Sequence, residues 1–200
     1  NAAVRYENYS DFGSTTNGKI SARYKLNKTF TIRASASTGF RAPSLQQRYY
    51  ANTSTVFTSG VPAEVGTFPN DSRPAQLLGI PKLSPEKSKS VSLGFTGNLG
   101  KLKITLDGYY TKIDDRVIYT GQFTGSNAPG ASPVDKEIYQ LLSLANATGA
   151  AFFANALNTE TRGIDLIISY KFKLGKGTLN ADFAGNASKT NQVGPIHVSE

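Results

Sequence analysis

The chain has 200 residues and a formal net charge of +8. This positive charge is compatible with binding to nucleic acid, anionic lipid or acidic ligands, and it does not distinguish among them. It has no cysteine, so disulfides, thiol chemistry and cysteine–metal sites are excluded, and no apolar run approaches the length of a membrane-spanning helix. Gly and Asn are frequent and helical periodicity is scarce, a composition that favours an all-β chain with many turns.

Seven segments alternate apolar and polar residues with a period of two, which predicts strands. In chain order, their apolar residues run from Val4 to Tyr6, Ile20 to Leu26, Phe30 to Ala36, Val91 to Phe95, Leu102 to Tyr110, Ile164 to Phe172 and Leu179 to Phe183. Each predicted strand has roughly ten residues, enough to cross a bilayer when tilted. The apolar face would then meet lipid, with Tyr110 and Tyr170 as candidates for the aromatic girdles.

The connections between these strands alternate in length. The stretches "KLNKT", "GNLGK" and "LGKG" are short and predict hairpin turns, in which Asn and Gly adopt the positive φ angles that tight turns need. The connections at 39–85 and about 120–158 are long. Short turns at one end of the strands and long loops at the other are typical of an outer-membrane barrel.

A soluble β-sandwich is the alternative, because its strands also alternate and also have one wet face. Two features favour the barrel over the sandwich. The predicted strands are longer than is usual in sandwiches, and loops beyond about 15 residues are uncommon in compact domains.

The two long loops differ in their expected structure. In the first, Pro and Gly interrupt any regular run, so no helix or strand is predicted there. In the second, Ser132 can cap a helix with Pro133 at its first position and Asp135 at its third. The apolar residues of one helical face follow: Ile138, Leu141, Leu142 and Ala145. We expect a short helix over the barrel mouth, which either covers loop backbone or grips a ligand.

Four stretches carry a resemblance to a known family: "RYENYSDFGSTTNGKISARYKLNKTFTIRAS", "RASASTGFRAPSLQQRYY", "LSPEKSKSVSLGF" and "NTETRGIDLIISY". In this order they resemble the TonB-dependent receptors of Gram-negative outer membranes, over a region from about Val4 to Asn186. The resemblance implies a barrel of about 22 strands plugged by a separate N-terminal domain. Residues 1–200 would then be part of the barrel domain, without the plug or the remaining strands. Seven strands cannot close as the family barrel does.

The resemblance also implies a function, which is energy-coupled import across the outer membrane. The partners would be the TonB system, acting through the absent plug, the outer-membrane lipid and a small-molecule ligand. Ferric siderophore is the default expectation for the ligand, followed by oligosaccharides, cobalamin and peptides. A secreted or surface-exposed β-rich adhesin or binding protein without transport is the alternative from another class. A passive porin is the alternative within the membrane class.

The polar face of the strands is charged, and in a barrel it would line the lumen. Its basic residues are Arg5, Arg23, Lys25, Arg33, Lys101, Lys103, Lys171 and Lys173, and its acidic residues are Glu7, Asp107, Asp165 and Asp182. We expect Lys101, Lys103, Lys171 and Lys173 to hold an acidic counterpart on the plug. The alternative is a hydrated lumen wall with no specific partner.

Arg and Tyr side chains in or beside the long loops are candidate ligand contacts, because Arg binds carboxylate or phosphate with a fork and Tyr offers a flat, amphipathic surface. These residues are Arg48, Tyr49, Tyr50, Arg73 and Arg116. The alternative for each is loop packing. Arg41, in the stretch Phe40-Arg41-Ala42-Pro43, is interpreted as a structural rim element rather than a contact.

Catalysis, metal binding and nucleic-acid binding have little support in the sequence. A single histidine, His197, lies near the end of the chain without a patterned partner. No motif places a nucleophile with a base or a carboxylate pair, so neither an enzyme nor a cofactor is expected. The pairs Asp114-Asp115 and Asn70-Asp71 lack the spacing of a calcium loop. Basic residues lie opposite most apolar ones with acids among them, unlike the aromatic-interleaved stripe of a nucleic-acid binder.

Overall fold

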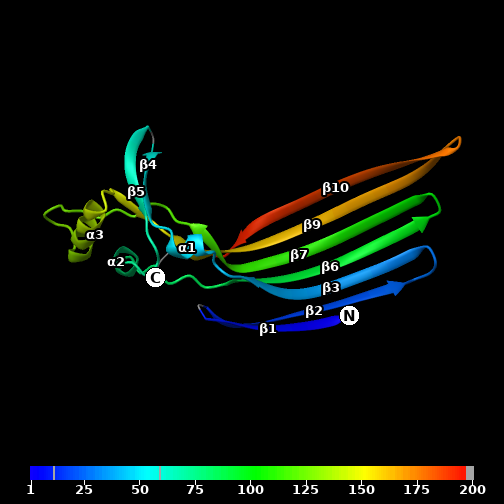
Figure 1. The fold of residues 1–200 in the computed structure, drawn as a ribbon, viewed down its shortest axis with the longest axis horizontal. Helices are drawn as coiled ribbons and strands as arrows, with labels where there is room; N and C mark the ends of the chain where they lie inside the picture. The colour runs from blue at the N-terminus through cyan, green and yellow to red at the C-terminus, as the bar shows by residue number, and fades with distance from the viewer. Residues whose placement is uncertain (11, 59, 197–200) are drawn as a thin grey trace. The chain divides into compact units, whose positions relative to one another are not determined.

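The computed structural model describes residues 1–10, 12–58 and 60–196, and its strands form two sheets (Figure 1). The larger sheet has seven strands in the order β1-β2-β3-β6-β7-β9-β10, and the smaller has three in the order β4-β5-β8. His197 lies outside the described residues.

The larger sheet follows the chain, so each strand lies beside its neighbours in sequence apart from the loop insertions. Its strands are β1 (Ala2–Tyr9), β2 (Gly13–Lys25), β3 (Phe30–Arg41), β6 (Glu86–Leu99), β7 (Leu102–Tyr119), β9 (Phe153–Leu174) and β10 (Gly177–Val193). The registered pairs β1–β2, β2–β3, β6–β7 and β9–β10 are antiparallel. The sheet is open, with β1 and β10 as its two ends, so the seven predicted strands are confirmed and no barrel closes.

The chain divides into two compact units, which are described separately. One, here called the strand unit, comprises residues 1–40, 87–114 and 158–193. The other, here called the loop unit, comprises 41–86 and 115–157 together with the described residues at 194–196. No helix in the described part of the chain is long and apolar enough to cross a membrane.

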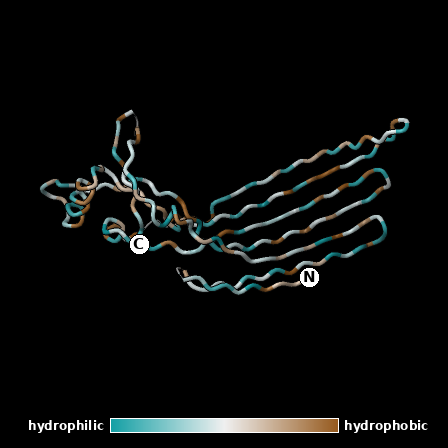
Figure 2. Tube along the Cα trace, in the orientation of Figure 1, coloured by the Kyte–Doolittle hydropathy of each residue, from teal (hydrophilic) through white to brown (hydrophobic). Residues whose placement is uncertain are grey.

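The strand unit has one apolar and one polar face, as the alternation predicts. Figure 2 shows hydrophobic and hydrophilic residues taking turns along each long strand. On the apolar face, large side chains stand exposed, among them Val4, Ile20, Leu93, Ile164 and Phe183. In β7 the apolar run from Leu102 to Tyr110 matches the roughly 9–11 residues that a strand needs to cross a bilayer.

Six of the seven strands are longer than the predicted ten residues or so, with 12 residues in β3 and 22 in β9, whereas β1 has 8. Most of the extra length lies toward the long loops, where the strict alternation that identified the strands ends, as at Val117 and Ile118 in β7. The predicted loop at 120–158 is correspondingly too long, because β9 begins at Phe153. Backbone pairing continues there without a regular alternation, which periodicity does not detect.

Two of the three short turns have the predicted positive φ angles, whereas the turn between β2 and β3 is held by an asparagine side chain instead. The side-chain oxygen of Asn27 accepts hydrogen bonds from the backbone N–H groups of Thr29 and Phe30, both at 2.8 Å. Gly100 and Gly175 stand at the other two turns with φ angles of 66° and 58°, in the region that favours glycine.

The loop unit has its own small core, built from both long loops. The first loop supplies α1 (Leu45–Tyr49), β4 (Asn52–Thr58), β5 (Val61–Thr67) and α2 (Arg73–Leu77); the second supplies α3 (Pro133–Leu144) and β8 (Gly149–Ala151). β5 pairs in parallel with β8, with Val65 opposite Gly149. The core residues are Ala75, Ile80, Ile138, Leu142, Ala147, Ala150 and Phe152. The expectation that the first loop has no regular structure is therefore wrong, because its strands are held by a long-range pairing with the second loop.

Helix α3 confirms the predicted cap. Ser132 accepts a hydrogen bond from the backbone N–H of Asp135 at 3.0 Å and donates one to its carboxylate at 2.8 Å. Ile138 and Leu142 are each 2% exposed and belong to the core. The helix therefore covers the inside of the loop unit, and its placement over a barrel mouth stays a prediction.

A buried carboxylate joins the two ends of the first long loop. Glu86 is 5% exposed. It accepts hydrogen bonds from Arg41 Nε at 3.0 Å and from a terminal guanidinium nitrogen at 2.5 Å. The backbone N–H of Val117 also donates to Glu86, at 2.9 Å. Arg41 is thus a structural element of this rim, as its sequence context indicated.

We predict that Arg41→Gln opens the loop unit, because it leaves a buried carboxylate without its cation. Such a loss costs about 1–3 kcal/mol, or roughly 5- to 150-fold faster hydrogen exchange at the Val117 amide. The measurement is amide exchange by mass spectrometry on the protein expressed from its own gene. Lys82→Gln, on an exposed loop position, is the control and leaves the exchange rate unchanged. Adding Glu86→Gln to Arg41→Gln recovers part of the protection; equal exchange in all variants would contradict the role of this pair.

Candidate functional site

The polar face of the strand unit carries an unneutralised basic patch at the end with the short turns. Here the turn-end lysines are defined as Lys101, Lys103, Lys171 and Lys173. All four are exposed, and within the described residues none makes an ion pair. The backbone N–H of Lys171 donates to the carbonyl of Lys101 at 3.0 Å, so the turns of β6–β7 and β9–β10 lie side by side. The structure therefore brings the predicted residues together.

Further cations extend the patch across the sheet. Arg23 lies directly opposite Arg33 in the β2–β3 register, and Lys25 lies opposite Thr31. A hollow of about 540 Å³ beside this hairpin is lined by Arg23, Lys25, Asn27, Lys28, Thr31 and Asn98. Its lining contains cations and neutral donors but no carboxylate, which is the chemistry of a site for an anionic group.

Most acids predicted for the polar face already have local partners. Arg33 forms a fork with Asp107, in which Nε donates to Oδ1 at 2.9 Å and a terminal nitrogen contacts Oδ2. Asn186 donates to Asp165 at 2.5 Å, and Arg5 pairs with Glu7 at 2.7 Å. These carboxylates are therefore engaged away from the turn-end lysines.

Glycine makes room for the Arg33–Asp107 fork. Gly94 lies directly opposite Asp107 in the β6–β7 register. A Cβ atom at position 94 would lie 2.5 Å from Arg33 Nε and 2.8 Å from its Cγ. The Arg33 side chain thus reaches from β3 across β6 to Asp107 on β7, and it passes over Gly94, where any larger residue would clash with it.

Three of the predicted ligand contacts, Arg48, Tyr49 and Tyr50, follow one another at the C-terminal end of α1, and the two tyrosines are exposed. Tyr49 and Tyr50 are 58% and 48% exposed, and the Arg48 guanidinium lies 5.2 Å from the centre of the Tyr49 ring. Ser44 and Gln47 close a capping box that fixes the start of this short helix. A cation stacked beside two exposed phenol rings can contact a flat anionic ligand.

The other two predicted ligand contacts, Arg73 and Arg116, lie in different environments from the residues of α1. Arg73, at the start of α2, pairs with Glu137 of α3, with 2.7 Å between Nε and a carboxylate oxygen. This carboxylate raises the pKa of the Arg73 guanidinium above its ordinary value, first by the hydrogen bond and then by its charge. The pair fastens two helices that pack together, which gives Arg73 a structural role within the loop unit. Arg116 is half-buried on β7.

An aromatic cluster at the loop end of the strand unit was not predicted. The ring of Tyr9 stacks on that of Phe12 with 4.4 Å between centroids, and Phe40 packs against both. The signal was present as aromatic residues on both sides of the β1–β2 hairpin, but their contact with Phe40 depends on strand pairing. Within the described residues, no group of three or more His, Asp and Glu side chains is arranged to hold a metal ion.

Comparison with known proteins gives one family and several relatives. The profile of the family "TonB dependent receptor-like, beta-barrel" matches residues 1–195. The vitamin B12 transporter BtuB of Vibrio cholerae is 25% identical over 118 residues, which are 59% of this chain and 15% of that protein.

Two solved structures share the fold. The siderophore receptor PirA from Pseudomonas aeruginosa has a TM-score of 0.62 and 15% identity over 94% of this chain and 31% of that one. The RagAB peptide transporter has a TM-score of 0.60 and 13% identity over 98% of this chain and 21% of that one. The chain thus spans less than a third of the length of each of these relatives.

The family consists of receptors and transporters rather than enzymes, and its proteins reside in the outer membrane of Gram-negative bacteria. None of these comparisons supports a secreted adhesin. Because the family profile covers nearly all of its residues, the chain belongs to the β-barrel domain of the TonB-dependent receptors.

Proposed function

We propose that this chain forms part of the wall and the outer loops of a receptor that imports a scarce ligand by TonB-coupled active transport. The observation that carries the proposal is the family match across residues 1–195. The fold supports it: one strand face is apolar, the other is polar and charged, and the two long loops fold together into a compact unit. Residues 1–200 would be one portion of the barrel domain of a larger receptor.

Three classes of ligand are candidates for this chain. The relatives are named for vitamin B12, a siderophore and peptides. We favour a ferric siderophore, because the Arg48 cation lies over the exposed Tyr49 ring, with the exposed Tyr50 next in the chain. Arg73 would position α2 through its ion pair with Glu137 instead of contacting the ligand. Arg116 would contact the ligand from β7.

The turn-end lysines would hold an acidic surface of the plug domain. They are exposed, and within the described residues they have no ion-pair partner, while Asp107, Asp165 and Glu7 have partners elsewhere on the same face. Several like charges side by side repel one another unless an anion lies among them. A plug carboxylate cluster would relieve this repulsion and keep the plug seated until TonB acts.

We predict that removing the α1 surface weakens ligand capture. The triple variant Arg48→Ala, Tyr49→Ala, Tyr50→Ala loses a cation and two aromatic surfaces, so the affinity falls at least tenfold. The measurement is uptake of radiolabelled ferric siderophore, cyanocobalamin or peptide by cells that carry the gene as their only receptor, with and without a protonophore. Lys82→Ala is the control and retains uptake. Uptake that persists with the protonophore would contradict active transport and favour a passive porin.

We predict that neutralising the turn-end lysines loosens the plug. In Lys101→Gln, Lys103→Gln, Lys171→Gln, Lys173→Gln, the loss of four charges raises single-channel conductance in planar bilayers and lowers uptake severalfold. Lys82→Gln with Lys136→Gln, which removes charge from the loop unit instead, is the control. Unchanged conductance and uptake in the quadruple variant would leave a hydrated lumen wall as the better account of these lysines.

A further inference from the structure

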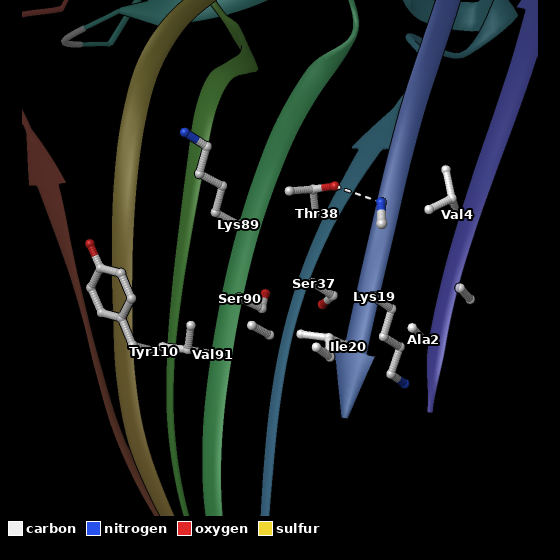
Figure 3. Close-up of a pocket in the computed structure, with 13 residues that line it drawn as sticks. Ala2, Val4, Lys19, Ile20, Ser37, Thr38, Lys89, Ser90, Val91 and Tyr110 are labelled. Carbon is white, nitrogen blue, oxygen red and sulfur yellow. Dashed lines mark hydrogen bonds between the residues drawn. The ribbon is translucent and has the colours of Figure 1, made fainter. Parts of the chain in front are cut away.

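The exposed apolar surface of the strand unit is accounted for by the membrane. An apolar hollow of about 530 Å³ crosses β6, β3, β2 and β1 on its apolar face, and Val91, Ile20 and Val4 are among the side chains that line it (Figure 3). In an outer-membrane barrel this face meets the hydrocarbon of the bilayer, whereas the long loops lie in water. Exposed groups of the loop unit therefore need another explanation.

The small sheet of the loop unit has one protected edge and one open edge. At the β8 edge, the backbones of Phe123 and Ala150 pair through two hydrogen bonds of 2.8 and 2.7 Å. β4 (Asn52–Thr58) forms the opposite edge and pairs along its whole length with β5. Among the described residues, no backbone group of Ser54 to Phe57 bonds to a segment other than β5. β4 therefore presents a row of free backbone donors and acceptors.

β4 lacks the features that protect most edge strands from pairing. Natural edges are blunted by charged residues, proline, bulges or very short strands. β4 has seven residues with neither a charge nor a proline, and its register with β5 has no bulge. The other strand of the hairpin, β5, contains both Pro62 and Glu64. Figure 1 shows this hairpin standing out from the rest of the loop unit. Such an edge has the form that proteins use for binding by strand addition.

Two apolar side chains flank the open edge, one on each face of the hairpin. Phe57 is 70% exposed and Val56 is 39% exposed. Neighbouring residues of a strand point to opposite faces, so these two side chains mark both faces of β4. A strand added beside β4 would lie about 4.8 Å away. An apolar residue of that strand would cover Phe57.

The face that carries Phe57 also carries an acid. Thr55 has the parity of Phe57 and lies directly opposite Glu64 on β5, and its hydroxyl donates to Oε1 of Glu64 at 2.7 Å. Within the part of the chain that the structure describes, Glu64 makes no ion pair. A residue beside Thr55 on an added strand would lie two strand spacings from Glu64, roughly 10 Å. The long side chain of Lys or Arg covers that distance, so the acid favours a basic residue there.

We propose that β4 binds an extended peptide segment of another protein by antiparallel strand addition, with an apolar residue beside Phe57 and a basic residue beside Thr55. Antiparallel pairing is the more stable of the two orientations, and it places the apolar residue two positions before the basic one. Backbone hydrogen bonds supply affinity, and the two side chains supply specificity. A second copy of β4 is a poorer partner, because β4 has no basic residue. The proposal does not depend on the import of any ligand.

The test measures the binding of fluorescent peptides to the receptor, expressed from its own gene and purified in detergent. The probe is the capped hexapeptide Thr-Ile-Val-Lys-Thr-Thr, which places Ile beside Phe57 and Lys beside Thr55. One control peptide has Glu in place of Lys, and a second is the probe with every backbone nitrogen methylated. Val56→Lys puts a charge on the open edge, and its matched control, Val61→Lys, puts the same charge on an exposed position of β5. Thermal unfolding confirms that each variant is folded.

We expect the probe to bind the parent and Val61→Lys alike, and to bind Val56→Lys at least tenfold more weakly. The Glu peptide should bind the parent at least threefold more weakly than the probe, and Glu64→Gln should remove this difference. The methylated peptide should not bind, because it cannot donate backbone hydrogen bonds. The probe should also slow amide exchange within β4 of the parent.

Three results would overturn the proposal. The first is no binding of the probe to the parent, and the second is equal binding to the parent and Val56→Lys. The third is a parent that dimerises through β4 in place of binding the probe, which Val56→Lys would abolish. If Val56→Lys does not fold, Ser54→Lys, at another exposed position of β4, decides, with the same loss expected and no loss counting against the site.

Discussion

A strand that crosses a bilayer must satisfy its backbone N–H and C=O groups within the sheet and keep charge off the side that faces hydrocarbon. A Lys or Arg at the bilayer midplane on that side costs about 2–4 kcal/mol. The strand unit obeys both conditions. Its neighbouring strands pair in register, and along its apolar runs no charged residue lies on the apolar face. Every basic residue is consequently displaced either to the polar face or beyond the ends of the apolar run.

The loop unit is subject to a different constraint. Its long connections must provide hydrogen-bond partners for their backbone N–H and C=O groups without a continuous sheet. Side chains that reach several segments do much of this. Glu86 joins Arg41 to the backbone of Val117, and the Asn155 amide donates to the carbonyls of Ser84 and Asp115 at 2.9 and 2.6 Å. Both groups sit where the loops leave the strands. The stretches that carry the family resemblance near Arg41 and Glu86 are therefore in contact, although 45 positions separate them.

Sequence alone predicted the features that depend on local chemistry. The strands follow from period-two alternation, the turns from Asn27, Gly100 and Gly175, and α3 from Ser132, because each signal lies within a few residues. Pairings between distant segments escaped prediction. The parallel pairing of β5 with β8 and the Arg73–Glu137 ion pair join the two long loops. No local sequence pattern predicts either contact. Parity places the turn-end lysines on the polar face, whereas their proximity required the Lys171–Lys101 backbone contact.

The basic residues at the loop end of the apolar face, among them Lys89 and Lys112, were overlooked for a related reason, since the alternation was followed only as far as apolar residues marked it. Extending the same parity past Tyr110 reaches Lys112, and the β6–β7 register then supplies Lys89. Charge is thus sorted twice in one sheet: cations on the polar face gather at the short turns, and cations on the apolar face gather at the long loops. The first group would look into the barrel and the second out into the membrane. One sheet therefore separates its cations both by face and by end.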